Sequence, residues 1–374
     1  MKIAIVTKHF TFRNGSSRAI HEVAQRIARR GHEVQLFCHR GPGFEVAPVR
    51  LRPVPLLPLG SWARVLSFDA ASRWRLRRER FDIVHGHGNL TVQDVVTVRT
   101  CRRANLMARG RRPSWRDPHL YLEARQFRYP GLRRIVVLSE RARRDLAHHY
   151  GIPIERPVTI PNGVDADRFH PHREALRARV RADLGLAPGM LAVLFVASGN
   201  FENRGLSNLL PALAQTSARI ALVIAGGDRL GRYRERVSAL SLEARVRLLP
   251  FRDRIEELHA AADALVFPSY YDTFGNVPLE AMASGLPVIV SSQCGMSELL
   301  TDGVDGLILR QPADRVALAA LLTRLEDDTL RARLGAAARA TAERYSWDAV
   351  AEQTLALYHA IVEERRAGPL EAGS

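Results

Sequence analysis

The sequence is poor in cysteine and contains no long apolar run. Its three cysteines, at positions 38, 101 and 294 of 374 residues, are odd in number and widely separated, which suits neither a disulfide framework nor a cysteine-based metal site. We therefore expect reduced thiols, as in the cytoplasm. No apolar run approaches the ~18 residues of a membrane-spanning helix, and the apolar start at residues 3–6 fits a first strand better than a signal peptide. These absences predict a cytoplasmic protein that is soluble or peripheral to a membrane.

The bulk composition is that of a globular protein. Hydrophobic residues make up 46% of the chain and charged residues 25%, which excludes the disordered and fibrous classes. The length is sufficient for two domains with separate cores.

The charge is unusual in size and in distribution. The formal net charge is +16, and residues 1–186 hold 36 Lys and Arg against 16 Asp and Glu, which leaves 19 against 23 for residues 187–374. The first half is thus +20 and the second −4. This asymmetry predicts an anionic partner for the first half, either an acidic glycolipid or an anionic membrane; no nucleic-acid partner is expected, because no nucleic-acid-binding motif is present. Because nearly every basic residue is Arg, genome composition is an alternative explanation.

One stretch, residues 269–285, organises the rest of the chain. It joins two short apolar runs, 264–268 and 287–290, which we interpret as buried strands of a parallel sheet. Asn276 is a candidate N-cap and Gly285 a candidate C-terminal residue, so we expect a helix from about 277 to 284.

The start of this expected helix is suited to a phosphate. Its first amides lack helical partners and carry the positive end of the helix dipole; they belong to Phe274, Gly275, Asn276 and Val277. Asp272 and Glu280 flank them, where sugar hydroxyls would donate to the carboxylates. A sugar nucleotide has all these parts, although an ordinary strand-turn-helix with a Gly and an Asn in its turn is the alternative interpretation.

Asp272 and Glu280 stand eight residues apart, and this frame resembles the Glu-x7-Glu signature of family-4 retaining glycosyltransferases. The resemblance implies an α/β protein of the GT-B fold, with two Rossmann-like domains facing each other across a cleft and a C-terminal helix crossing back. It further implies that Glu280 holds the ribose and Asp272 the donor sugar. The departure from the family is that Asp272 is one methylene shorter than Glu.

Other segments extend the resemblance over nearly the whole chain. Residues 81–87 resemble the Asp-Ile-Val-His-x-His strand end, 161–165 the Pro-Asn-Gly-Val-Asp crossing between domains, and 295–298 the Gly-x-x-Glu turn. The family has a pair of basic residues for the donor diphosphate in the loop that corresponds to 198–206. Here Arg204 provides one of the two positive charges, and the neutral Asn203 stands in place of the other.

Three further residues follow from the same comparison. Gly226 lies where the nucleotide rests against the backbone, and Gly15 is a partial match to a Gly-Gly pair in the first loop. Arg99 stands where many members have a His close to the reacting centre. The resemblance therefore gives Asp272, Arg204 and Arg99 catalytic roles, and donor-binding roles to Gly15, Gly226, residues 274–277 and Glu280.

The expected organisation is an acceptor-binding domain at 1–165, a nucleotide-sugar-binding domain at 166–345, a returning helix at 346–366 and a disordered tail at 367–374. We expect no cofactor and no metal: the His85 and His87 pair lacks a third ligand, and Asp165-Ala166-Asp167 is interpreted as turn chemistry. An apolar, Pro-punctuated loop at 53–59 and two basic segments at 73–80 and 99–116, which contain Trp and Leu, together suit a membrane interface or, alternatively, solvated helix faces.

The predicted function is metal-independent, retaining hexosyl transfer from a nucleotide-diphosphate sugar, with UDP-glucose or UDP-N-acetylglucosamine as the expected donor. The expected acceptor is a cell-envelope glycan or glycolipid. The turn at Cys294 and the basic insert 99–134 weakly resemble the lipopolysaccharide core glucosyltransferase branch. A non-catalytic nucleotide-sugar-binding protein of the same fold is the alternative.

Overall fold

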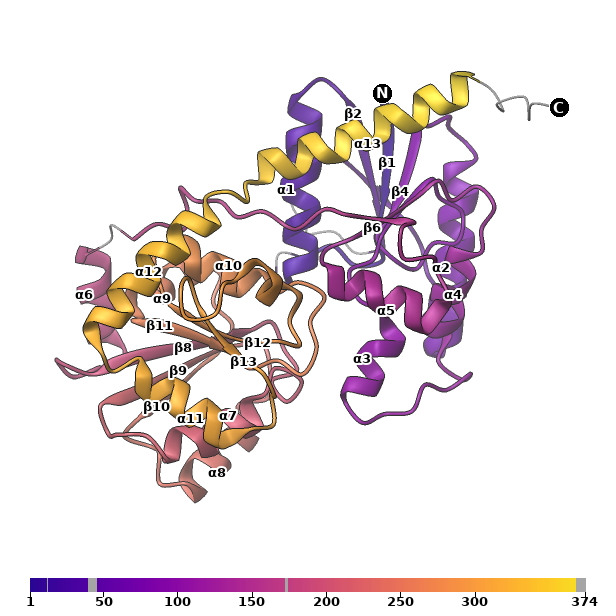
Figure 1. Ribbon diagram of the computed structural model, residues 1–374. Coiled ribbons are helices and arrows are strands. Elements are labelled where there is room, and N and C mark those ends of the chain that lie inside the picture. The colour runs from indigo at the N-terminus through magenta and orange to yellow at the C-terminus, as the bar shows by residue number, and fades with distance from the viewer. Residues whose placement is uncertain (12, 40–45, 172–173, 368–374) are drawn as a thin grey trace. The chain divides into compact units, whose positions relative to one another are not determined.

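The structure is a computed structural model that describes residues 1–11, 13–39, 46–171 and 174–367. The chain forms two compact units (Figure 1). Unit 1 consists of Met1–Asn162 and the chain from Trp347 onward, and unit 2 is Gly163–Ser346. Each has its own parallel sheet and its own core, so each is described by itself.

Within the described residues, unit 1 contains a seven-stranded sheet in the order β3-β2-β1-β4-β5-β6-β7, and all its pairs are parallel. The strands are β1 (Lys2–Val6), β2 (Glu33–Cys38), β3 (Arg50–Pro53), β4 (Ile83–Gly86), β5 (Val95–Thr97), β6 (Arg134–Val137) and β7 (Pro157–Thr159). The chain reverses its direction of travel across the sheet between β1 and β4, and the crevice at such a switch point is where open α/β sheets bind ligands.

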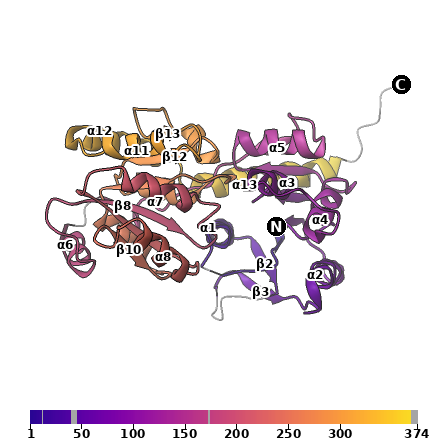
Figure 2. The ribbon, with the colours of Figure 1, turned by 90° about the horizontal axis from the view of Figure 1, so that it is seen from below.

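Six helices connect and cover this sheet in the part of unit 1 that the structure describes: α1 (Gly15–Arg29), α2 (Gly60–Leu76), α3 (Arg102–Ala108), α4 (Pro118–Phe127), α5 (Glu140–Tyr150) and α13 (Trp347–Ala367). The side chain of Asn14 caps α1 by accepting from the amide of Ser17. Helix α2 packs beside α4 (Figure 2).

Helix α13, the yellow helix in Figure 1, lies along α1. Its apolar side chains, among them Trp347, Leu355, Tyr358 and Ile361, are buried in the same core cluster as Ile3 of β1. This burial explains why the end of the chain belongs to unit 1. Ala367, the first residue of the predicted tail 367–374, is the last residue of the helix, and the rest of that tail lies outside the described residues.

Unit 2 contains, in its described part, a six-stranded parallel sheet in the order β10-β9-β8-β11-β12-β13. The strands are β8 (Leu191–Ala197), β9 (Ile220–Gly226), β10 (Val246–Leu249), β11 (Ala264–Phe267), β12 (Val288–Ser291) and β13 (Leu307–Leu309). Every residue of β8, β9, β11 and β12 is buried, as the continuous apolar runs predict for a parallel sheet covered on both faces.

The connecting elements of unit 2 are α6 (Glu174–Asp183), α7 (Leu206–Ala214), α8 (Gly231–Ala239), α9 (Ile255–Ala261), α10 (Asn276–Ala283), the 3-10 helix η1 (Gly295–Leu299), α11 (Arg315–Arg324) and α12 (Asp328–Ala342). The direction of travel across this sheet changes between β8 and β11. The loops that leave the carboxyl ends of these two paired strands are therefore neighbours, and they carry Arg204 and Asp272.

Candidate active site

The carboxyl edge of the unit 2 sheet brings together the residues that the sequence singles out in that unit. Asp272 and Arg204 form an ion pair. One nitrogen of Arg204, Nη1, also donates to the backbone oxygen of Tyr271 at 3.0 Å and to the hydroxyl of Ser269 at 3.1 Å. Both charged side chains are largely covered, with 26% of Arg204 and 18% of Asp272 exposed. Two residues 68 positions apart in sequence thus form one charged pair.

The helix that follows begins one residue earlier than the sequence predicts. Asn276 is the first residue of α10, and the N-cap position is Gly275, which has φ +96° and makes no side-chain cap bond. The prediction of Asn276 as the N-cap is therefore wrong. A Cβ on Gly275 would lie 2.6 Å from Sγ of Cys294, so the strand-to-helix turn has room only for glycine.

The amides at this helix start do not all remain available, contrary to the prediction from sequence. The amide of Phe274 donates to Oδ1 of Asp272 at 3.1 Å. Among the described residues, no protein acceptor receives the amides of Gly275 and Val277. Glu280 lies one turn inside α10 and is partly exposed. The helix start therefore has two amides without a protein acceptor in the described part of the chain, those of Gly275 and Val277. The carboxylate of Asp272 already occupies the amide of Phe274 next to them.

Gly226 ends β9 in the same unit, and its backbone runs close to that of β8. A Cβ at this position would lie 1.8 Å from the backbone oxygen of Ala197. This close approach is a structural reason for glycine that is independent of any ligand. Gly226 therefore lies at the same carboxyl edge as Arg204 and Asp272, with no side chain to obstruct that edge.

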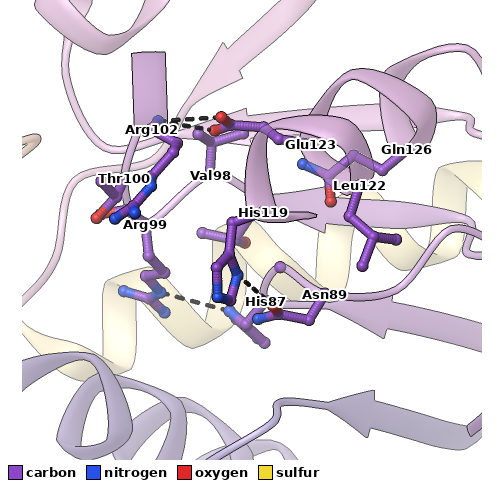
Figure 3. A pocket seen from close by; sticks show the side chains of 12 residues that line it. His87, Asn89, Val98, Arg99, Thr100, Arg102, His119, Leu122, Glu123 and Gln126 are labelled. Atoms are coloured by element: carbon purple, nitrogen blue, oxygen red, sulfur yellow. Dashed lines mark hydrogen bonds between the residues drawn. The ribbon is translucent and has the colours of Figure 1, made fainter. Parts of the chain in front are cut away.

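Unit 1 contains a cavity of about 320 Å³ at the carboxyl ends of β4 and β5 (Figure 3). It is lined by His87, Gly88, Asn89, Thr97, Val98, Arg99, Thr100, Arg102, His119, Leu122, Glu123 and Gln126. Arg99 is the only one of these residues that the sequence singles out as part of a site. Gly15, the other predicted site residue of unit 1, is the first residue of α1 and is exposed, and it does not line this cavity.

Arg99 is held in place within the cavity wall. Its Nη1 donates to Oδ1 of Asn162 at 2.8 Å, and its Nε donates to Nδ1 of His87 at 3.4 Å. Burial lowers the pKa of Arg99 to about 10, so the guanidinium remains charged at neutral pH. Since Nδ1 of His87 accepts, the proton of this neutral ring is on Nε2.

A second histidine packs against the ring of His87. The rings of His85 and His87 are stacked with centroids 4.4 Å apart. His85 is bonded through Nδ1 to the hydroxyl of Tyr358 at 2.5 Å and through Nε2 to that of Thr97 at 2.7 Å, and burial lowers its pKa to about 3. Burial likewise holds the pKa of His87 well below its usual value. Both rings are therefore neutral parts of the cavity wall at pH 7.

Helix α4 supplies the polar side chains that the sequence analysis missed. Both oxygens of Glu123 accept from the amide of Arg102, at 3.0 and 3.1 Å, and the hydroxyl of Tyr150 donates to the same carboxylate. Burial raises the pKa of Glu123 to about 7. Gln126 is only 4% exposed, and its Oε1 has no partner among the described residues.

A sequence signal for this cluster exists. His119, Glu123 and Gln126 are separated by four and then three residues, so an α-helix places them on one face. Asp117 caps that helix, and its carboxylate accepts from the amide of His119 at 2.9 Å. An Asp-Pro start followed by polar residues at this spacing predicts a helix with a buried polar face.

Metal ligands do not gather in the described part of the chain. No group of three or more His, Cys, Asp or Glu side chains among the described residues is arranged to hold a metal ion. The described helices also contain none that is long and apolar enough to cross a membrane.

Two family models divide the chain between them. The model described as "Glycosyltransferase Family 4" matches residues 13–168, and that described as "Glycosyl transferases group 1" matches residues 177–341. A D-inositol 3-phosphate glycosyltransferase of Kineococcus radiotolerans is 30% identical, over 92% of this chain and 90% of that protein. Its counterpart in Geodermatophilus obscurus is 31% identical, over 94% of this chain and 86% of that protein.

Solved structures agree in fold. The structure of WaaG, a glycosyltransferase involved in lipopolysaccharide biosynthesis, matches with a TM-score of 0.84 at 22% identity, over 95% of this chain and 99% of that one. The structure of Anabaena HepE with UDP and glucose matches with a TM-score of 0.80 at 19% identity, over 96% of this chain and all of that one. With two Rossmann-like units of the GT-B type and relatives of this similarity, the chain belongs to the group 1, family 4 glycosyltransferases.

Proposed function

We propose that this glycosyltransferase transfers a hexose, with retention and without a metal, from UDP-glucose or UDP-N-acetylglucosamine to a glycan or glycolipid of the cell envelope. The observation that carries the proposal is the start of α10, where amides without a protein acceptor among the described residues lie beside the Arg204–Asp272 pair, with Glu280 one turn into the helix, at the switch point of a parallel sheet. Amides and a guanidinium suit a diphosphate, and carboxylates suit ribose and sugar hydroxyls. In this proposal unit 2 is the donor half and unit 1 the acceptor half.

Charge development explains how such a site would accelerate transfer. Negative charge grows on the diphosphate as the anomeric bond breaks, so donors that are fixed around it stabilise the transition state more than the ground state. Arg204 and the amides of Gly275 and Val277 are those donors. We propose that the acceptor hydroxyl attacks from the side of the leaving group and that a phosphate oxygen takes its proton, because Asp272 is paired with Arg204 and Glu280 is assigned to the ribose, so neither carboxylate serves as nucleophile in this proposal.

The cavity of unit 1 supports an anionic acceptor. Arg99 and Arg102 lie in its wall, and Nε2–H of the neutral His87 ring adds a donor for hydroxyl or phosphate oxygens, whereas Nδ1 of His119 already donates to Oδ1 of Asn89. The half of the chain that contains it has a formal charge of +20. Names of relatives point the same way, since they include D-inositol 3-phosphate glycosyltransferases and a lipopolysaccharide enzyme.

A panel of sugar nucleotides tests the donor and the catalysis together. UDP-, GDP- and ADP-sugars would be compared by thermal shift, and hydrolysis of the best binder would then be followed without acceptor. We expect a UDP-sugar to stabilise the protein most, hydrolysis to be slow but measurable, and both to persist in chelator. Binding without hydrolysis or transfer would favour the non-catalytic alternative, and loss of binding in chelator would contradict metal independence.

A second proposal concerns a membrane surface on unit 1, and exposed aromatic side chains favour it. Trp115 is 82% exposed, and the ring of Trp62 lies 5.7 Å from that of Tyr121, which is also exposed. Exposed apolar side chains continue along the start of α2, at Leu59 and Leu66. The basic residues around them are Arg64, Arg111, Arg112, Arg116 and Arg125. Aromatic and basic side chains together suit the headgroup region of an anionic bilayer.

Liposome flotation tests this surface. We expect the protein to float with anionic vesicles at low salt, to lose this binding in high salt, and to lose it also in the variant Trp115→Ser. The matched control is Val316→Ser, which removes a 72% exposed apolar side chain from unit 2. Equal recovery with neutral and anionic vesicles would refute membrane contact and favour genome composition as the reason for the arginines.

A further inference from the structure

Asp272 takes two of the contacts that the sequence predicts for a phosphate, those with Arg204 and with the amide of Phe274. Its Oδ1 accepts from the amide of Phe274 at 3.1 Å, next to the start of α10, and its Oδ2 is paired with Arg204. A helix-start amide and a guanidinium are the donors that a phosphate oxygen would be expected to use there. In the free protein, the phosphate place is therefore held by an anion of the chain itself.

Arg204 is engaged in this arrangement through one nitrogen and through its stacking on an aromatic ring. Its Nη1 faces the carboxylate of Asp272, the backbone oxygen of Tyr271 and the hydroxyl of Ser269, and its guanidinium carbon lies 5.3 Å from the ring centre of Phe267. A diphosphate at the open amides of Gly275 and Val277 would bring a second anion to a guanidinium that already holds one. Two anions that share one cation repel each other at close range, so one of them is expected to move.

The carboxylate is the part that is able to move. The backbone of Asp272 is bonded on both sides: its amide donates to the oxygen of Gln293 at 3.2 Å, and its oxygen accepts from the amide of Gly295 at 2.9 Å. These bonds fix the main chain, and rotation about the side-chain bonds is then sufficient to release Arg204. No loop needs to open.

We propose that Asp272 is an internal anion that holds Arg204 and the Phe274 amide until the donor diphosphate exchanges with it, after which the released carboxylate binds hydroxyls of the donor sugar. The proposal rests on the proposed function and adds to it an order of events. Bare diphosphate must displace Asp272 with nothing gained by the carboxylate, whereas a sugar nucleotide gives the carboxylate new donors. The site thereby discriminates against its own product, the bare nucleoside diphosphate.

Removal of the charge at position 272 tests the exchange. We expect Asp272→Asn to bind UDP about tenfold more tightly than the wild-type protein in calorimetry, because loss of a charged hydrogen bond to Arg204 frees that side chain. The affinity for UDP-glucose should rise much less, because Asp272→Asn also removes the contact between the carboxylate and the donor sugar. Asn keeps an acceptor for the Phe274 amide, and the shorter Asp272→Ser provides a second variant that should tighten UDP in the same direction.

A second mutation distinguishes exchange from a general change in charge. In an Arg204→Gln background the gain from Asp272→Asn should fall below about twofold, because the proposal routes the effect through Arg204. The control Asp183→Asn removes the same charge from unit 2 at an exposed position on α6 and should leave UDP affinity unchanged.

The outcomes separate the two levels of the proposal. If the wild-type protein binds UDP but both substitutions at position 272 leave its affinity unchanged or weaken it, the exchange is refuted and the proposed function stands. A gain that persists in the Arg204→Gln background also refutes the exchange. Absence of binding of UDP, GDP and ADP to wild-type protein would refute the proposed function, and the exchange with it.

Discussion

Glu123 should make unit 1 less stable as the pH rises, and the variant Glu123→Gln isolates that effect. Burial raises the pKa of this carboxyl from 4.5 to about 7, so the folded state binds its proton more tightly than the unfolded state. The resulting stabilisation is fully present below pH 4.5 and is lost as the pH rises through 7. The pKa difference corresponds to about 3 kcal/mol, since one pKa unit is worth about 1.4 kcal/mol.

The measurement is urea unfolding between pH 4.5 and 8.5, followed by tryptophan fluorescence. The four tryptophans, at positions 62, 74, 115 and 347, all belong to unit 1, so this signal reports the unit that contains Glu123. We expect the free energy of unfolding of the wild-type protein, relative to Glu123→Gln, to fall by about 3 kcal/mol over this range. Glu155→Gln, at an exposed position in the same unit, should follow the wild type. Parallel profiles for wild type and Glu123→Gln would refute this account of the cavity.

Three further predictions concern unit 2, one of them with a comparison residue, Gly31, in unit 1. Burial lowers the pKa of His259 to about 3, and neither ring nitrogen has a hydrogen-bond partner among the described residues. We therefore expect α9 to lose stability by about 1.4 kcal/mol for each pH unit below 6.5, because the unfolded state binds the proton more tightly. Hydrogen exchange of α9 should show this loss in the wild-type protein and not in His259→Leu. Gly205→Ala should lower the free energy of unfolding by about 3 kcal/mol or more, because φ is +83° and a Cβ would lie 2.1 Å from the backbone oxygen of Pro268. Gly31→Ala, with φ +87° and no atom within 4 Å of the Cβ, should lower it by about 1 kcal/mol, as measured by thermal unfolding. Glu280→Gln should weaken UDP and UDP-glucose by the same factor of about ten or more in calorimetry, and a loss confined to UDP-glucose would contradict a ribose contact.

Local sequence was sufficient for the elements around α10. The signals for these elements all lie within about 25 residues: the apolar runs on either side, the Pro that ends the first of them, Gly275 and Gly285. They could be interpreted from sequence because strand burial, glycine conformation and helix ends are local properties. The helix was misplaced by one residue, since Asn276 and Gly275 both suit an N-cap and only the close approach of Cys294 selects the glycine.

The pairing of Asp272 with Arg204 was beyond the reach of the sequence. It depends on β8 and β11 being neighbours, and strand order is decided by the packing of the whole sheet. The same reason applies to the cavity of unit 1, where Glu123 on α4 meets the amide of Arg102 and the hydroxyl of Tyr150 on α5. Each of these side chains is an ordinary polar residue in its own helix.

The sequence alone determined the family and the parallel α/β architecture, because composition, apolar periodicity and motif spacing are properties of the linear chain, and it predicted an anion site at the loop before α10. The tertiary structure alone decided which charges face one another and which are buried. It placed a carboxylate on the arginine that was expected to be free for phosphate, and it raised the pKa of a glutamate that the sequence left unremarked. Contact and burial depend on three-dimensional packing, and it is contact and burial that set the strength of a charge.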